Sequence, residues 1–223
     1  MKKEAAPFLN GCEVIETKKS GYASILLCKK EEKTFVVLIS GIGKGFACAG
    51  LAAALLTYDI DKVINAGIAG TLDAKLAPIL SCLISSSLVQ HDMDTSTLGD
   101  PKGMISGIDK VILPSDKALG EALGKASEKA LIPYSFGRIA SGDIFFPSGD
   151  ARKKDVIKDF SPLVIDMESA CFAQIAYVYG LPYCALRIIS DAEHPETEYA
   201  QNEEEGIRRI KMILDEYLKE IEA

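Results

Sequence analysis

The sequence predicts an α/β fold, with helices on both faces of a central mixed, mostly parallel sheet in a three-layer α/β/α sandwich. From residue 34 onward, short apolar stretches of strand character alternate with helical stretches, which is the order of elements in such folds. The chain has 223 residues, of which 48% are hydrophobic, enough for one large core. Because no linker, repeat or low-complexity segment interrupts it, we expect a single domain over residues 1–223.

The predicted strands are short apolar stretches bounded by turn residues. In chain order they cover residues 24–28, 34–39, 62–65, 78–89, 135–141, 163–166 and 183–189. The charged segment KKEEK joins the first two, which predicts a hairpin. Residues 92–112 hold few apolar side chains and predict a long loop.

The predicted helices occupy the longer stretches between the strands. They cover an alanine-rich run that follows the loop SGIGKG and ends at residue 56, and then residues 115–131, 153–160, 167–180 and 203–222. In the last helix, apolar residues fall near one face, which predicts an amphipathic helix packed on the domain. These residues are Ile207, Ile210, Leu214, Tyr217 and Ile221.

The composition excludes several classes of partner. The net charge is −7 and the basic residues are scattered, whereas binding to nucleic acid needs clustered lysine and arginine. Charged residues interrupt each apolar run before it reaches membrane-spanning length, and no apolar segment follows the basic N-terminus. We therefore expect no nucleic-acid partner, no membrane span and no signal peptide.

The cysteines and histidines argue against disulfides and metals. None of the six cysteines forms a C-x-x-C pair, and most lie in apolar segments, as buried thiols do in a reducing cytosol. The two histidines, His91 and His194, have no second histidine or cysteine at ligand spacing. We therefore expect a cytoplasmic protein without a metal site.

The most informative segment is a strand–helix–strand unit over residues 163–194. Its first predicted strand ends just before Met167 and Glu168, and its second ends at Ser190 and Asp191. Strands joined by a helix are normally parallel, so we expect Glu168 and Asp191 at one edge of the sheet, where ligands bind. The alternatives are that the helix dipole favours Glu168, that Asp191 caps a loop or a helix, and that Met167 fills the core.

Glycine-rich or acidic loops follow the predicted strands at residues 41–45, 67–70, 141–143 and 190–191. The segment GIGKG lacks the spacing of a P-loop and, taken alone, is typical of a tight turn that needs positive φ. Four such loops at one edge of a sheet indicate a ligand site.

Six segments in order resemble the purine nucleoside phosphorylase/uridine phosphorylase superfamily, and within it the 5′-methylthioadenosine/S-adenosylhomocysteine nucleosidases. They are SGIGK (40–44), NAGIAG (65–70), QHDMDTSTLG (90–99), SGDIFF (141–146), DMES (166–169) and RIISD (187–191). The resemblance covers nearly the whole chain. It implies a nucleoside phosphorylase-like fold, a small-molecule purine nucleoside as substrate and no cofactor.

That family hydrolyses the N-glycosidic bond of an adenine nucleoside with a thioether at C5′, through an oxocarbenium-like sugar. The resemblance implies that Asp191 protonates N7 of adenine, which calls for a raised pKa, and that Ser190 orients it. It assigns Glu168 to the ribose hydroxyls and Met167 to the sugar face. Glu4, in a segment like M-x-x-E-x-x-x-L, matches the base that activates water.

The resemblance also predicts contacts to the base and the sugar. Phe145 and Phe146 match a pair that flanks adenine, with two core aromatics at a strand end as the alternative. Further predicted contacts are Ile42, Ile68, Ala69, Gly70 and Arg187. Ile68 is apolar where some relatives carry serine or threonine. His91 and Asp92 lie in a segment near the 5′ side and receive no catalytic role.

Water is the expected nucleophile. The related phosphorylases carry an arginine two residues before the first glycine of the GIAG-like loop, and here that position is Asn65. Lys44 alone makes a poor site for a phosphate dianion. The alternatives are a hydrolase for another nucleoside, such as a futalosine-type or 6-oxopurine compound, a purine nucleoside phosphorylase, or a weakly active nucleoside-binding homologue.

Two further expectations follow from the resemblance. The family has a strand before the glutamate that matches Glu4, and this chain starts after it, so we expect that strand to be absent and the anchor of Glu4 to be looser. The family forms homodimers in which the partner subunit helps to close the 5′ pocket, so we expect a homodimer.

Overall fold

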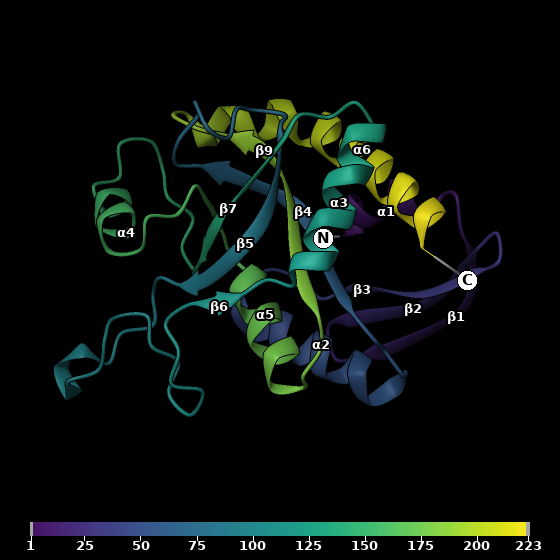
Figure 1. The fold of residues 1–223 in the computed structure, drawn as a ribbon, viewed down its shortest axis with the longest axis horizontal. Helices are drawn as coiled ribbons and strands as arrows, with labels where there is room; N and C mark the ends of the chain where they lie inside the picture. Colours follow the sequence, from purple (N-terminus) through teal and green to yellow (C-terminus); the bar gives the residue numbers. More distant parts are fainter. Residues whose placement is uncertain (1, 222–223) are drawn as a thin grey trace.

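The computed structural model describes residues 2–221, and Figure 1 shows how their helices and strands are arranged. The strands are β1 (Glu13–Ser20), β2 (Ala23–Lys30), β3 (Lys33–Ile39), β4 (Val63–Thr71), β5 (Cys82–Gln90), β6 (Leu113–Pro114), β7 (Tyr134–Ser141), β8 (Val164–Asp166) and β9 (Tyr183–Asp191). The helices are α1 (Lys2–Leu9), α2 (Lys44–Thr57), η1 (Ser96–Leu98, a 3-10 turn), α3 (Lys117–Lys129), α4 (Arg152–Phe160), α5 (Ser169–Val178) and α6 (Pro195–Glu220). None of the helices in this part of the chain combines the length and the apolar character that crossing a bilayer requires.

Strands β1, β2 and β3 form a three-stranded antiparallel sheet. The β2–β3 pair confirms the predicted hairpin, whereas the sequence analysis does not predict β1. Every residue of β1 is exposed, and its sequence, EVIETKKS, carries charged side chains along its length. An edge strand of this kind is held by its hydrogen bonds to β2 and not by burial, so hydrophobic patterning does not reveal it.

The second sheet positions the site. Its strands lie in the order β6-β5-β7-β8-β4-β9, and β5 also pairs with β9. The ladders β4–β9, β5–β7 and β7–β8 are parallel, and the ladders β4–β8, β5–β6 and β5–β9 are antiparallel. The sheet is therefore mixed, and its two longest ladders, β4–β9 and β5–β7, are parallel.

The strands before Glu168 and Asp191 are not a parallel pair, which corrects the prediction for this unit. Strand β4 lies between β8 and β9 and runs antiparallel to β8. Glu168 and Asp191 still lie near the same end of β4, because β8 is only three residues long and pairs with the carboxyl end of β4. There Gly70 pairs with Ile165 on one side and with Asp191 on the other.

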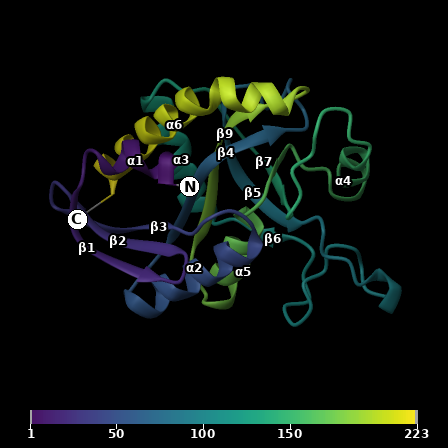
Figure 2. The same cartoon turned by 180° about the vertical axis from the view of Figure 1, so that it is seen from behind.

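Helices cover both faces of this sheet, as the sequence predicts (Figures 1 and 2). Helices α2 and α5 pack on one face, with Leu51 and Phe172 in the same buried cluster as Ile189. Helices α3 and α6 pack on the other face, with Leu123 and Ile213 in a second cluster. All residues of β9 are buried, because this strand runs between the two helical layers.

Helix α6 begins at Pro195, earlier than the predicted start at residue 203. Proline is favoured in the first turn of a helix, where its missing N–H is not needed. Glu198 accepts hydrogen bonds from the N–H groups of Ala192 (2.8 Å) and His194 (3.1 Å), which holds the entry into the helix. The added turns are mainly polar, so apolar periodicity does not mark them.

Helix α1 lies beside α6 and the first sheet and carries Glu4 (Figure 2). Lys3 forms an ion pair with Glu203 of α6 at 2.7 Å, and the ring of Phe8 lies 5.6 Å from that of Phe35 in β3. The described residues before Glu4 are helical, so this glutamate is supplied by a helix and not by the end of a strand.

Candidate active site

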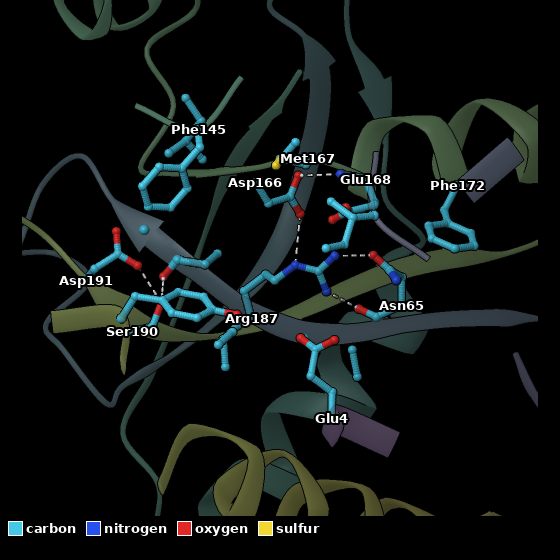
Figure 3. A pocket seen from close by; sticks show the side chains of 18 of the residues that line it. Glu4, Asn65, Phe145, Asp166, Met167, Glu168, Phe172, Arg187, Ser190 and Asp191 are labelled. Carbon is cyan, nitrogen blue, oxygen red and sulfur yellow. Dashed lines mark hydrogen bonds and ion pairs between the residues drawn. The ribbon is translucent and has the colours of Figure 1, made fainter. Parts of the chain in front are cut away.

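A cavity of about 290 Å³ lies at the carboxyl ends of β4, β8 and β9, and the loops after β3 and β7 also reach it (Figure 3). Its volume suits a small organic ligand. Every residue that the sequence assigns to the site lines this cavity. These residues are Glu4, Ile42, Ile68, Ala69, Gly70, Phe145, Phe146, Met167, Glu168, Arg187, Ser190 and Asp191.

Asp191 is a buried carboxyl group at one wall of the cavity, only 7% exposed. Burial raises its pKa, and the hydroxyl of Ser190, which donates to Oδ1 at 2.5 Å, partly opposes that rise. The position of Ser190 is set by Asn202, whose side chain donates to its carbonyl at 2.8 Å. A Cβ on Gly70 would lie 2.6 Å from Asp191 Oδ2, so the acid needs a glycine at this place. The arrangement holds a carboxylic acid that retains its proton more readily than an exposed aspartate.

Glu168 lies at the N-terminus of α5, next to Met167, and accepts a hydrogen bond from the N–H of Gly43 at 2.7 Å. Burial, and after it the nearby charge of Asp166, raise the pKa of Glu168 to about 7. The Gly43 N–H and Arg187 oppose this rise. The group therefore changes its charge near neutral pH and accepts hydrogen bonds from a ligand when it is ionised.

A buried ion pair lies beneath Glu168. Arg187 Nε donates to Asp166 Oδ2 at 2.8 Å, and both side chains are only 3% exposed. Asn65 accepts from the same guanidinium through its backbone carbonyl, at 2.9 Å, and through its side chain. The hydroxyls of Ser141 and Ser169 donate to Asp166 as well. Sequence reasoning missed Asp166, because nothing in the DMES segment indicates which distant cation pairs with its first residue.

Glu4 reaches the cavity from α1 and lies near Arg187 (Figure 3). A Cβ on Gly67 would lie 3.3 Å from both Glu4 Oε1 and Arg187 Nη1. The glycine therefore leaves room for these two side chains to approach the same point of β4. A carboxylate beside a fixed guanidinium is suited to holding a water molecule.

The two adjacent phenylalanines have different surroundings. Phe145 is 53% exposed and extends into the cavity (Figure 3). Phe146 is 5% exposed and belongs to a core cluster with Val156 and Phe160, and its ring lies 5.5 Å from that of His91. Phe146 is therefore mainly a core residue, which was the alternative prediction, although it also borders the cavity.

Two predicted contacts, Ile42 and Ile68, also differ. Ile42 is 53% exposed beside the cavity. Ile68 packs against the buried cluster between the sheet and helices α3 and α6. It lies close to α6, since a Cβ on Gly206 would be 2.9 Å from its Cγ2. Two residues that the sequence analysis does not single out, Lys153 and Tyr199, line the cavity too. Tyr199 lies in the polar first turns of α6, where the sequence carries no recognisable signal.

An α/β fold whose strand ends enclose a protonatable acid, a buried arginine and an exposed aromatic ring has the features of a nucleoside site. The profile of the phosphorylase superfamily matches residues 1–219, and the chain belongs to this family. The predicted superfamily is therefore confirmed.

Two nucleosidases and one solved structure are similar to this chain over most of its length. The chain is 33% identical over 159 residues to the aminodeoxyfutalosine nucleosidase of Helicobacter pylori, covering 71% of this chain and 68% of that protein. It is 33% identical over 175 residues to the 5′-methylthioadenosine/S-adenosylhomocysteine nucleosidase of Actinobacillus succinogenes, covering 78% and 75%. The solved structure of the futalosine hydrolase of Helicobacter pylori superposes with a TM-score of 0.91 at 28% identity, covering 99% of this chain and 95% of that chain.

Proposed function

We propose that this protein hydrolyses the N-glycosidic bond of 5′-methylthioadenosine and S-adenosylhomocysteine, releasing adenine and the thioribose. The observation that carries the proposal is Asp191, a buried acid with a raised pKa, in one cavity with Glu168, Arg187 and Glu4. Membership of the phosphorylase superfamily and similarity to nucleosidases support it.

In the proposed mechanism Asp191 donates a proton to N7 of adenine, which makes the base a better leaving group. Glu168, when ionised, accepts hydrogen bonds from the ribose hydroxyls and places negative charge near the cationic sugar. Met167 borders the sugar, and Phe145 stacks on the base. Glu4 accepts a proton from the water that attacks C1′, so the C1′–N9 bond breaks as a C1′–O bond forms.

Water is favoured over phosphate as the nucleophile. A phosphate dianion needs cations that are available to bind it. Arg187 is already bound to Asp166, and the ammonium group of Lys44 lies 2.8 Å from Asp92. Asn65 accepts hydrogen bonds from Arg187 and offers no positive charge.

A second candidate substrate is a futalosine-type nucleoside. The aminodeoxyfutalosine nucleosidase and the methylthioadenosine/S-adenosylhomocysteine nucleosidase are each 33% identical to this chain. Sequence identity therefore does not distinguish between the two kinds of substrate. A purine nucleoside phosphorylase and a weakly active nucleoside-binding homologue are further alternatives for the test.

The test is adenine release from 5′-methylthioadenosine, S-adenosylhomocysteine and aminodeoxyfutalosine in phosphate-free buffer. We expect turnover without phosphate, and a fall of at least about 100-fold in Asp191→Asn. Asp159→Asn is the matched control, because it neutralises an aspartate that forms an ion pair with Lys102 at 2.7 Å outside the cavity. Turnover that requires phosphate would identify a phosphorylase, and binding without turnover would identify a binding protein.

We also propose that the protein is a cytoplasmic homodimer. The rings of Tyr22 and Phe46 lie 4.8 Å apart, both are exposed, and a Cβ on Gly41, next to Ile42, would lie 2.8 Å from the Tyr22 ring. A group of exposed apolar side chains beside a cavity is typical of an interface. The cysteines are free thiols, which supports a reducing compartment. Analytical ultracentrifugation tests the dimer, and sedimentation as a monomer at every concentration would contradict it.

A further inference from the structure

A closed ring of hydrogen bonds joins three segments beside the cavity. Lys44 begins α2, Asp92 follows β5, and Asp143 follows β7. The backbone N–H of Lys44 donates to Asp143 Oδ1 at 2.8 Å, and the backbone N–H of Asp143 donates to Asp92 Oδ2 at 3.0 Å. The ammonium group of Lys44 donates to Asp92 Oδ1 at 2.8 Å, which closes the ring.

The ring fixes the Gly43–Lys44 peptide group, which directly follows the peptide group that holds Glu168. Gly43 directly precedes Lys44, and its N–H donates to Glu168 Oε1 at 2.7 Å. Gly43 has φ 91°, and a Cβ there would lie 2.9 Å from Asp143 Oδ1. Backbone conformation and the position of Asp143 therefore both require glycine, and they set the direction of the Gly43 N–H.

Asp92 is the acceptor on which the ring depends. The side chains of Lys44 and Asp92 are 22% and 18% exposed, so water screens their ion pair less than a surface pair. Burial alone would raise the pKa of Asp92, but the hydrogen bonds from Lys44 and from the Asp143 N–H outweigh it and lower the pKa. Asp92 is therefore ionised at neutral pH and accepts both hydrogen bonds.

We propose that Asp92 is a positioning residue: through Lys44 and Asp143 it holds the Gly43 N–H against Glu168 and so sets where Glu168 meets the ribose. Asp92 itself is not among the described residues that line the cavity. This inference rests on the proposed function, because it uses the assignment of Glu168 to the ribose hydroxyls.

Other charged groups act on Glu168 independently of Asp92. Asp166 of β8 and Glu4 of α1 disfavour its ionised form, and Arg187 of β9 favours it. Loss of the ring removes the contribution of the Gly43 N–H and leaves these three in place. Disruption of the ring should therefore move the pKa of Glu168 upward from about 7.

The first experiment measures that pKa in the full-length protein without any substrate. Glutamate carboxyl carbons are labelled and titrated by NMR, and the Glu168 signal is assigned with Glu168→Gln. We expect an upward shift in Asp92→Ala and in Lys44→Met, and none in the surface control Asp159→Asn. If Asp92→Ala does not fold, Lys44→Met still tests the ring. An unchanged pKa in a folded ring variant would overturn the proposal.

The second experiment measures kcat and KM for the adenine nucleoside and for its 2′,3′-dideoxy counterpart. We expect Asp92→Ala to lower kcat/KM by about 10- to 100-fold on the nucleoside, because a misplaced Glu168 fits the transition state poorly. The loss on the dideoxy compound should be much smaller, since it has no hydroxyls for Glu168 to hold. Equal losses on both compounds would overturn the positioning role. No turnover by the unmodified protein, together with a shifted pKa, would contradict the proposed function and leave the coupling of Asp92 to Glu168 in place.

Discussion

Replacement of Gly70 by alanine tests whether the position of Asp191, the proposed proton donor, matters for activity. Gly70 pairs with Asp191 across the β4–β9 ladder, and a Cβ there would lie 2.6 Å from Oδ2 and 3.4 Å from Cγ. Because real Cβ atoms do not approach other heavy atoms within 3.0 Å, the Asp191 carboxyl group must move by roughly half an ångström. That movement disturbs its 2.5 Å hydrogen bond from Ser190.

The expected loss follows from this displacement. Misplacement of a reacting group by about 1 Å costs about 100-fold in rate, so we expect Gly70→Ala to lower kcat/KM for adenine release by about 10- to 100-fold. The φ angle of Gly70 lies outside the left-handed region, so alanine fits the backbone. The crowding should cost only about 1–3 kcal/mol of unfolding free energy.

Gly137→Ala is the matched control, assayed by adenine release and by urea unfolding. A Cβ on Gly137 in β7 would lie 2.6 Å from Leu163 Cδ1, which is the same overlap against an apolar side chain outside the cavity. We expect a comparable loss of stability and unchanged kcat/KM. Full activity in Gly70→Ala, or an equal loss of activity in Gly137→Ala, would refute the reasoning.

Three further predictions concern charge and burial. Burial and then Asp166 raise the pKa of Glu168 from 4.5 to about 7, so the folded protein binds this proton more tightly than the unfolded chain does. The unfolding free energy should therefore fall by up to about 3 kcal/mol as pH rises from 4.5 to 7, and Glu168→Gln should flatten that slope in urea titrations. Arg187→Met leaves Asp166 buried without its partner and should cost about 3–5 kcal/mol of unfolding free energy, whereas a cost below about 1 kcal/mol would contradict the buried ion pair. Phe146→Ala should lower stability by about 3–5 kcal/mol, and Phe145→Ala should raise KM with little change in melting temperature; equal effects of the two would show that their surroundings do not differ as described.

Elements with an apolar pattern were predictable, and those without one were not. Strands β2, β3 and β9 carry apolar stretches that mark them in the sequence alone, whereas only the first residues of β4 do. Strand β1 is exposed, helix α1 has no fully buried residue, and the first turns of α6 are mainly polar, so contacts with other elements hold them. Hydrophobic periodicity reports burial, so it does not detect elements whose stability comes from hydrogen bonds and ion pairs.

The site shows the same division. The six ordered motifs contain every residue assigned to the cavity except Glu4, although residues 67–70 and 190–191, which were predicted as loops, lie within β4 and β9. The motifs do not reveal that Arg187 pairs with Asp166, or that Asp92 closes a ring with Lys44.

The sequence by itself determined the class of fold and the segments that line the cavity, including the acid at position 191. Only the tertiary structure decided the direction of β8, the different burial of Phe145 and Phe146, and the partners of each charged group. The physical reason is that local pattern depends on neighbours in the chain, whereas strand pairing, burial and ion pairs join residues far apart in it. The pKa of a site residue depends on these distant neighbours, and so it is a property of the fold.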